Sequence, residues 1–230
     1  MADVVPDIIP DLRREGRTGV PELVYGAGKT AAQITEALVA LATAGRGALA
    51  TRVDPDKAAA VCAAIAGATY HAVARCVVVP AAASAARPAA SPIAVVCAGT
   101  SDLPVAEEAA VVAEFLGAPV VRIVDVGVAG IHRLLDRVAE IRACDVVIAV
   151  AGMEAALPSV LGGLIDAPLV AVPTSVGYGV SIDGLVALGA LLSACAPGIV
   201  VVNIDNGVGA AVAAVRIARL AARARAAEAR

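Results

Sequence analysis

The sequence predicts an α/β protein in two parts: a parallel sheet with helices on both faces, preceded by a small N-terminal α/β domain. Apolar β-branched runs alternate with helical patterns, without a tight hairpin signal. Strands joined through helices form parallel sheets with right-handed crossovers. A stretch rich in proline and alanine at 80–92 predicts a linker between domains at 1–79 and 93–230. The 60% hydrophobic content is mostly alanine and valine, which suits close packing of helices on a sheet.

In the N-terminal part, we expect an irregular or helical arm up to residue 20 and strands at 22–25, 48–53 and 69–79. Thr30 and Gln33 fit a capping box for a helix that ends near residue 44. Asp54 followed by Pro55 predicts the start of a second helix, which Gly67 ends.

The turn GAGK at 26–29 lacks the glycine that a Walker A motif requires, because Leu23 stands there. A glycine turn with Lys29 at a helix N-terminus remains, which is either a generic anion site or a plain turn.

In the C-terminal part, we expect alternating elements and a last helix from about 208 to the end. The expected strands are 93–97, 120–125, 145–151, 168–172 and 199–204, and the helices between them are 103–116, 131–142, 155–165 and 183–194. Polar or glycine-rich sequence follows each strand, and ligands bind outside the carboxyl ends of such strands. Five arginines near the end of the last helix fit its dipole and predict a solvated end: Arg216, Arg219, Arg223, Arg225 and Arg230.

Candidate site residues follow the first two of these strands. Gly99, Thr100, Ser101 and Asp102 offer amides, hydroxyls and a helix start to a phosphate or ribose, although Ser101 or Asp102 could simply cap the helix. His132 and Arg133 follow the second strand, and the arginine makes a phosphate or substrate contact plausible where a lone histidine is usually structural.

Three further candidates lie later in the chain. Glu154 is the only charged residue between Asp145 and Asp166. Because the surrounding sequence is apolar, we expect the pKa of Glu154 to be raised and its carboxylate to act as a base. The alternative is a solvated acid at the start of a helix. The loop 173–179 is an active-site loop or an ordinary connection. Cys195 is a reactive thiol or a small buried apolar residue.

Composition excludes several classes of protein. Five cysteines without a CxxC pair, and an N-terminus unlike a secretory signal, favour reduced thiols in the cytoplasm. A net charge of −3 provides no broad basic surface for nucleic acid. The uncharged run 184–202 is long enough to span a membrane, but Pro197 and Gly198 divide it, so we expect a soluble protein without a membrane partner.

The motifs GTSD at 99–102, IHR at 131–133 and AGMEAALP at 151–158 resemble phosphoribosylaminoimidazole carboxylase, the flavodoxin-like octameric enzyme of purine synthesis. Two departures are Ala156, where that family has histidine, and the addition of an N-terminal domain and Cys195. Both departures resemble the LarB family of nickel-pincer cofactor carboxylases, which serves lactate racemase maturation. Segments similar to LarB are 24–30, 50–52, 98–102, 125–133, 172–179 and 195–207.

This resemblance implies carboxylation of nicotinic acid adenine dinucleotide at C5 of its pyridinium ring, from CO2 or bicarbonate. Cleavage of the phosphoanhydride would release AMP and pyridinium-3,5-biscarboxylic acid mononucleotide. It also implies a homo-oligomer, an octamer by resemblance, and Mg²⁺ with unassigned ligands.

The resemblance implies a role for each candidate residue. Cys195 would be the nucleophile and Glu154 the base, with His132 in the catalytic set. Substrate or phosphate binding would fall to Gly99, Thr100, Ser101, Asp102, Arg133, Lys29, Thr51, Arg52 and Asp205. Two alternatives stay open: an aminoimidazole ribonucleotide carboxylase or mutase, and a non-catalytic nucleotide-binding module in which Cys195 is only core.

Overall fold

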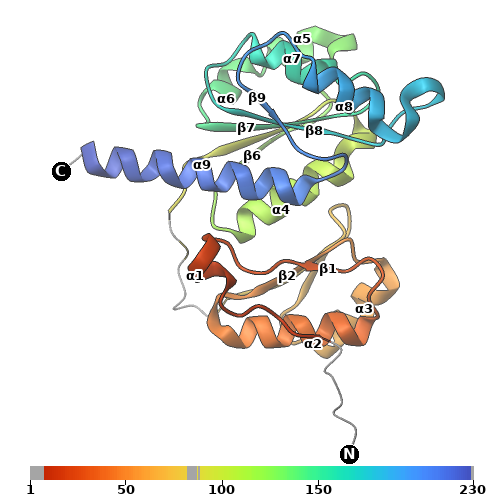
Figure 1. Cartoon of the computed structure of the whole chain (residues 1–230), viewed down its shortest axis with the longest axis vertical. Helices are drawn as coiled ribbons and strands as arrows, with labels where there is room; N and C mark the ends of the chain where they lie inside the picture. Colours follow the sequence, from red (N-terminus) through yellow and green to blue (C-terminus); the bar gives the residue numbers. More distant parts are fainter. Residues whose placement is uncertain (1–7, 82–86, 88, 229–230) are drawn as a thin grey trace, which may run out of the picture. The chain divides into compact units, whose positions relative to one another are not determined.

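The computed structural model describes residues 8–81, 87 and 89–228. The chain divides into two compact units, Met1–Arg87 and Pro88–Arg230, each with its own sheet (Figure 1). The division falls within the predicted 80–92 linker, of which 82–86 and 88 lie outside the described residues. Residues 1–7 of the predicted arm and Arg230 also lie outside them.

The C-terminal unit contains a five-stranded sheet in which every neighbouring pair is parallel. The strand order is β6-β5-β7-β8-β9, which is the 2-1-3-4-5 order of flavodoxin-like folds. The predicted fold class is therefore confirmed. The strands are β5 (Ile93–Cys97), β6 (Val120–Ile123), β7 (Val146–Ala151), β8 (Leu169–Pro173) and β9 (Ile199–Val201).

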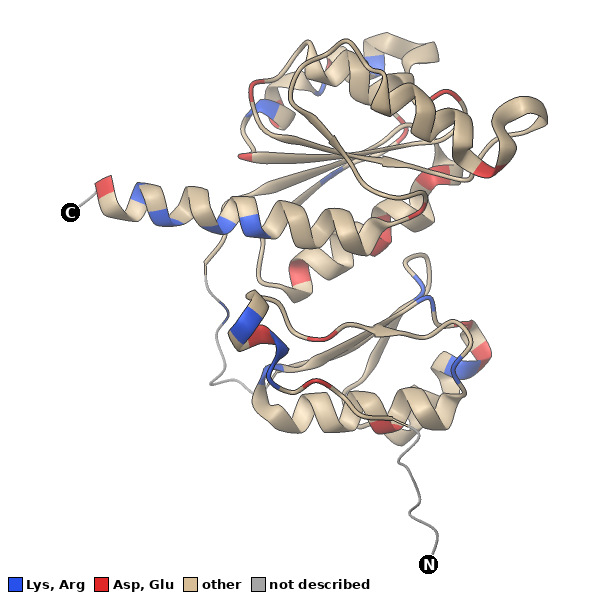
Figure 2. Cartoon of the chain, in the orientation of Figure 1, with Lys and Arg blue, Asp and Glu red and all other residues tan. Residues whose placement is uncertain are grey.

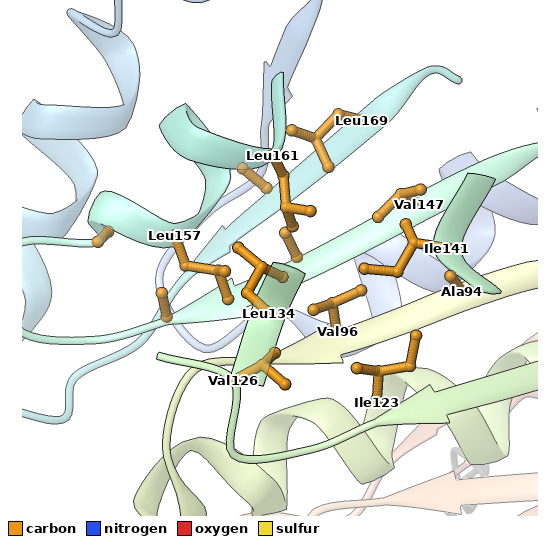
Figure 3. Packing of buried hydrophobic residues seen from close by; sticks show 14 of the residues in the cluster. Ala94, Val96, Ile123, Val126, Leu134, Ile141, Val147, Leu157, Leu161 and Leu169 are labelled. Atoms are coloured by element: carbon orange, nitrogen blue, oxygen red, sulfur yellow. The ribbon is translucent and has the colours of Figure 1, made fainter. Parts of the chain in front are cut away.

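Helices cover both faces of this sheet (Figure 1). On one face, α4 (Leu103–Phe115) packs along α9 (Gly207–Glu228). The other face is covered by α5 (Ile131–Leu135), α6 (Val138–Arg142), α7 (Ala156–Gly162) and α8 (Leu185–Leu192). Leu134, Leu157 and Leu161 of these helices point onto Val96 and Val147 of the strands (Figure 3). These side chains form a buried aliphatic layer between the sheet and the helices on this face.

Three expectations for this unit are corrected. The helix expected at 131–142 is two short helices, because the chain turns at Asp136 and Arg137. Strands β6 and β9 end at Ile123 and Val201, earlier than expected. The basic end of α9 (Figure 2) is not wholly solvated, since Arg219 is buried and donates a 2.7 Å hydrogen bond to the Leu116 carbonyl.

The N-terminal unit has a mixed sheet in the order β1-β2-β4-β3, with only β1 and β2 parallel. Thr30 and Gln33 form the predicted capping box at the start of α2, and a π-helical turn η1 follows that helix. The elements are α1 (Arg14–Thr18), β1 (Val24–Tyr25), α2 (Ala31–Leu41), η1 (Ala42–Arg46), β2 (Ala48–Thr51), α3 (Pro55–Ala64), β3 (Thr69–His71) and β4 (Cys76–Val79).

One expectation for this unit was wrong: the single strand expected at 69–79 is an antiparallel hairpin of β3 and β4. Its turn at 72–75 contains no glycine, proline or asparagine, and Arg75 adopts the left-handed conformation with φ of 52°. The helix start predicted at Asp54 and Pro55 is confirmed: Asp54 is the N-cap residue of α3, although its side chain pairs with Arg75 and makes no capping hydrogen bond.

Across the part of the chain that the structure describes, no helix is both long and apolar enough to cross a membrane.

Candidate active site

A cavity of about 610 Å³ lies at the carboxyl ends of the strands in the C-terminal unit. The loops after β5, β6, β7 and β8 all contribute to its wall, as expected for a ligand site in a parallel sheet. Five of the predicted site residues line it: Gly99, Ser101, Asp102, Arg133 and Glu154.

Close backbone packing fixes the shape of this cavity. A Cβ atom on Gly152 would lie 2.4 Å from the Val176 carbonyl oxygen and 2.6 Å from the Thr174 hydroxyl. A Cβ atom on Gly127 would lie 2.9 Å from the Ala98 carbonyl oxygen. Glycine is therefore required where the loops of neighbouring strands meet.

Asp102 lies at the base of the cavity and is only 4% exposed. Its Oδ1 accepts a 2.6 Å hydrogen bond from the Thr174 hydroxyl, and its Oδ2 accepts a 3.0 Å hydrogen bond from the Gly99 amide. Burial raises the pKa of this carboxyl, and these hydrogen bonds partly offset the rise.

Arg133 and Asp125 form an ion pair at the side of the cavity. The guanidinium lies over Gly130, where a Cβ atom would come within 2.7 Å of Arg133 Nε. Arg133 is partly exposed and can offer planar donors to a phosphate or carboxylate.

Glu154 lines the cavity with an exposed side chain, so the apolar burial expected for it is not present in the single chain. It lies between two residues in the left-handed conformation, Met153 with φ of 55° and Ala155 with φ of 49°. Residues other than glycine rarely adopt this conformation. Glu154 therefore lies in a tight turn that joins the end of β7 to the start of α7.

Cys195 does not line this cavity. It is exposed and precedes β9, at the amino end of the sheet, whereas the cavity lies at the carboxyl ends. A single chain therefore does not bring Cys195 to Glu154. The thiol nearest the cavity in sequence, Cys97, is buried, and desolvation raises its pKa to about 12. That thiol is a poor candidate nucleophile.

Three other predicted residues of this unit also lie outside the cavity lining. Thr100 and His132 are both exposed, each on a short helix. Asp205 uses its Oδ1 to accept a 2.8 Å hydrogen bond from the Ser175 amide. It therefore anchors the loop after β8, which contributes Val176 to the cavity.

Lys29, Thr51 and Arg52 belong to the N-terminal unit. Lys29 follows β1, Thr51 is the last residue of β2, and Arg52 follows it. The Gly26 amide donates a 2.8 Å hydrogen bond to the Thr51 carbonyl, so the chain after β1 is joined to the end of β2. The three residues therefore lie at or after the carboxyl ends of these two parallel strands.

Within residues 8–81, 87 and 89–228, no group of three or more histidine, cysteine, aspartate or glutamate side chains is arranged to hold a metal ion. The described side chains therefore do not fit a Mg²⁺ ion held by the protein alone.

Sequence reasoning missed Thr174, Asp125 and Tyr178 as individual site residues. All three lie in segments that the sequence did single out, Asp125 in 125–133 and Thr174 and Tyr178 in 172–179. Nothing in the local sequence pairs Thr174 with Asp102, because 72 residues separate them.

The fold and the cavity define a doubly wound α/β protein with a small-molecule site at the carboxyl end of its sheet. Residues 92–229 match the family model described as AIR carboxylase, and residues 8–81 match the LarB/PurE-like N-terminal domain. The chain belongs to the AIR carboxylase family, with a LarB/PurE-like N-terminal domain, and enzymes of this family are carboxylase-type.

Two proteins of Methanocaldococcus jannaschii are similar to this chain. The uncharacterized protein MJ0165 is 40% identical over 218 residues, which cover 91% of this chain and 83% of that protein. An N5-carboxyaminoimidazole ribonucleotide mutase is 38% identical over 135 residues, which cover 56% of this chain and 79% of that protein.

Proposed function

We propose that this protein carboxylates C5 of the pyridinium ring of nicotinic acid adenine dinucleotide and cleaves the phosphoanhydride. The products would be AMP and pyridinium-3,5-biscarboxylic acid mononucleotide. The observation that carries the proposal is the combination of a LarB/PurE-like N-terminal domain with a carboxylase-type domain that has Ala156 in its cavity. The purine carboxylases that this domain resembles have histidine there, so a different acid-base group is required.

The chemistry explains why a thiolate is needed. A pyridinium ring is an electrophile and does not attack CO2. Addition of the Cys195 thiolate to C4 forms a C–S bond and gives a neutral 1,4-dihydropyridine, whose C5 is an enamine carbon. C5 then attacks CO2 and forms the new C–C bond. Glu154 accepts the C5 proton, and departure of the thiolate from C4 with its electron pair restores the aromatic ring.

Other groups would bind the substrate. Arg133 would hold a phosphate, and Ser101 and the amides near Gly99 would bind phosphate or ribose. His132 would orient the substrate, and Lys29, Thr51 and Arg52 would bind substrate or phosphate, as the resemblance to LarB implies. Mg²⁺ would be bound by the phosphates of the dinucleotide, and no step of the ring chemistry depends on it.

Because Cys195 and the cavity lie at opposite ends of one sheet, we propose that a second copy of the chain supplies the thiol. Mixing the inactive variants Cys195→Ala and Glu154→Gln tests this arrangement. Random reassembly would leave about a quarter of the sites with both groups intact and would restore activity. A mixture that stays inactive after dissociation and reassembly would contradict the shared site.

The direct test of the function uses nicotinic acid adenine dinucleotide, ¹³C-bicarbonate and Mg²⁺, followed by mass spectrometry. We expect AMP and a mononucleotide that carries one labelled carboxylate. Cys195→Ala should abolish carboxylation and retain binding of the dinucleotide, and Glu154→Gln should stall after CO2 capture. AMP release without label, or full turnover by Cys195→Ala, would overturn the proposal.

The second candidate is an aminoimidazole ribonucleotide carboxylase or mutase, which the similarity to the archaeal mutase favours. Turnover of that ribonucleotide, without turnover of the dinucleotide, would support this second function over the first. The absence of both reactions, together with ligand binding, would indicate a nucleotide-binding module.

A further inference from the structure

Tyr178 is an aromatic side chain at the cavity that the proposed chemistry does not use. It lines the cavity next to Val176 and Gly177, and 80% of its surface is exposed. Aromatic residues are scarce in this chain, which has three tyrosines, one phenylalanine and no tryptophan. Among the described residues that line the cavity, Tyr178 is the only aromatic one. An uncovered ring at this place can offer its face to a flat ligand.

The backbone that carries this ring is anchored. The loop between β8 and α8 projects from the C-terminal unit (Figure 1), but the Tyr178 carbonyl accepts a 3.2 Å hydrogen bond from the amide of Ser181, which is buried. Gly177 packs against the same serine, since a Cβ atom on Gly177 would lie 2.7 Å from Ser181 Cβ. A ligand that contacts the Tyr178 ring therefore does not have to order the backbone beneath it.

The loop after β7 meets the loop after β8 beside Tyr178. The Met153 amide donates a 2.7 Å hydrogen bond to the Val176 carbonyl, and a Cβ atom on Gly177 would lie 3.8 Å from Met153 Sδ. Met153 is partly exposed and also lines the cavity. Its polarisable thioether suits contact with a flat ring. Glu154 follows Met153 directly, so this side of the cavity also carries the proposed base.

The charges of the cavity favour a cation. The described lining residues include three carboxylates, those of Asp102, Asp125 and Glu154, and a single cationic side chain, that of Arg133. Arg133 already pairs with Asp125. No second cation among these lining residues balances the other two acids. A ring that carries positive charge is therefore stabilised in this cavity more than a neutral ring of the same shape.

We propose that Tyr178, with Met153 beside it, binds a flat cationic ring and so selects an oxidised pyridinium over neutral rings. This inference rests on the proposed function in that it takes the ring to be the pyridinium of the dinucleotide. The face of a tyrosine ring carries negative charge density and attracts a cation that lies over it. A neutral ring keeps the apolar contact and loses this attraction.

The test compares two ligands of nearly the same shape: nicotinic acid adenine dinucleotide and its 1,4-dihydro form, whose ring is neutral. Calorimetric titration is done in the Cys195→Ala background, because addition of the thiolate would itself favour the oxidised ring. We expect Tyr178→Leu to weaken binding of the oxidised form about 5–30-fold, the range of a cation–π contact as it is desolvated. Binding of the dihydro form should change by less than about twofold.

Two further variants serve as controls. Tyr178→Phe keeps the ring face and should keep most of the preference for the oxidised form. Val180→Ala alters an exposed residue of the same loop that does not line the cavity, and should leave the preference unchanged. Equal weakening of both ligands by Tyr178→Leu, a preference that survives in this variant, or failure of both ligands to bind would each overturn the inference.

Turnover gives a second readout in protein that retains Cys195. The ring is neutral once the thiolate has added to C4, so Tyr178→Leu should raise KM for the dinucleotide without lowering kcat. A loss confined to kcat would overturn the inference even if the enzyme carboxylates the dinucleotide. A preference that depends on Tyr178, in a protein that forms no labelled product, would reject the proposed function and retain the site for a cationic ring.

Discussion

The Thr174 hydroxyl lies 2.6 Å from the Asp102 carboxylate, and both side chains are buried although 72 residues separate them. The pair fastens the loop after β8 to the start of the first helix of the C-terminal unit. It also places a titratable group in a poorly solvated position, which affects stability as well as geometry.

Asp102 should make the stability of the protein depend on pH. Burial raises its folded pKa above the unfolded value of 3.8. A carboxyl with a raised folded pKa contributes stability that is fully present below its unfolded pKa and is lost as pH rises through the folded pKa. The amide side chain of the Asp102→Asn variant does not titrate. The difference in free energy of unfolding, variant minus wild type, should therefore increase from pH 4 to pH 7. Urea titrations at each pH measure this difference, and a constant value would contradict the shifted pKa.

Gly152→Ala should destabilise the protein, because the added methyl group would lie within 2.6 Å of atoms of Val176 and Thr174. We expect a loss of about 1–3 kcal/mol in chemical unfolding. Gly189→Ala is the matched control, because Gly189 lies within α8 and no atom lies near its Cβ position. Alanine should increase the free energy of unfolding there by about 0.5–1 kcal/mol. Equal effects of the two substitutions would refute the packing described for Gly152.

Thiol reagents should distinguish the cysteines of the native protein. Cys195 is exposed, whereas Cys97 is 1% exposed and its pKa is raised to about 12. Iodoacetamide should label Cys195 first, and Cys97 only after denaturation, as measured by mass spectrometry of peptides. In the Cys195→Ser control, that fastest labelling should disappear. Labelling of Cys97 at the rate of Cys195 would show that the site opens readily.

Arg133→Ala should weaken binding of the dinucleotide by about 10–100-fold, since a hydrogen bond between charged groups contributes about 1.5–3 kcal/mol. Arg137→Ala is the control, because Arg137 pairs with Glu140 on the surface and does not line the cavity. Calorimetric titration measures both variants. Equal affinities of the Arg133→Ala and Arg137→Ala variants for the dinucleotide would show that Arg133 does not bind phosphate.

Much of the fold could be predicted because its signals are local. Apolar runs and helix starts identify the five parallel strands, and Thr30 with Gln33 identifies one helix start to the residue. The hairpin of β3 and β4 was missed because Arg75 takes a conformation that is usual for glycine. Turn prediction depends on residues that prefer such conformations, and none stands at 72–75.

The candidate site was predictable only in outline. Glycine, hydroxyl and acidic residues after each strand indicate where a ligand binds, and five of the predicted residues do line the cavity. The hydrogen bond from Thr174 to Asp102 depends on how two distant strand ends meet. In the proposed shared site, Cys195 and Glu154 would come from two copies of the chain, an arrangement that the periodicity of a single sequence does not describe.

The two left-handed residues beside Glu154 also bear on the entropy of binding. Glycine at 153 and 155 would relax the turn and leave it with many conformations, which a ligand would have to restrict in every catalytic cycle. With methionine at 153 and alanine at 155, the backbone of the turn is instead restricted when the chain folds, before any ligand binds. The loop is then already ordered when a ligand arrives, so the binding energy of the ligand remains available for holding it in place.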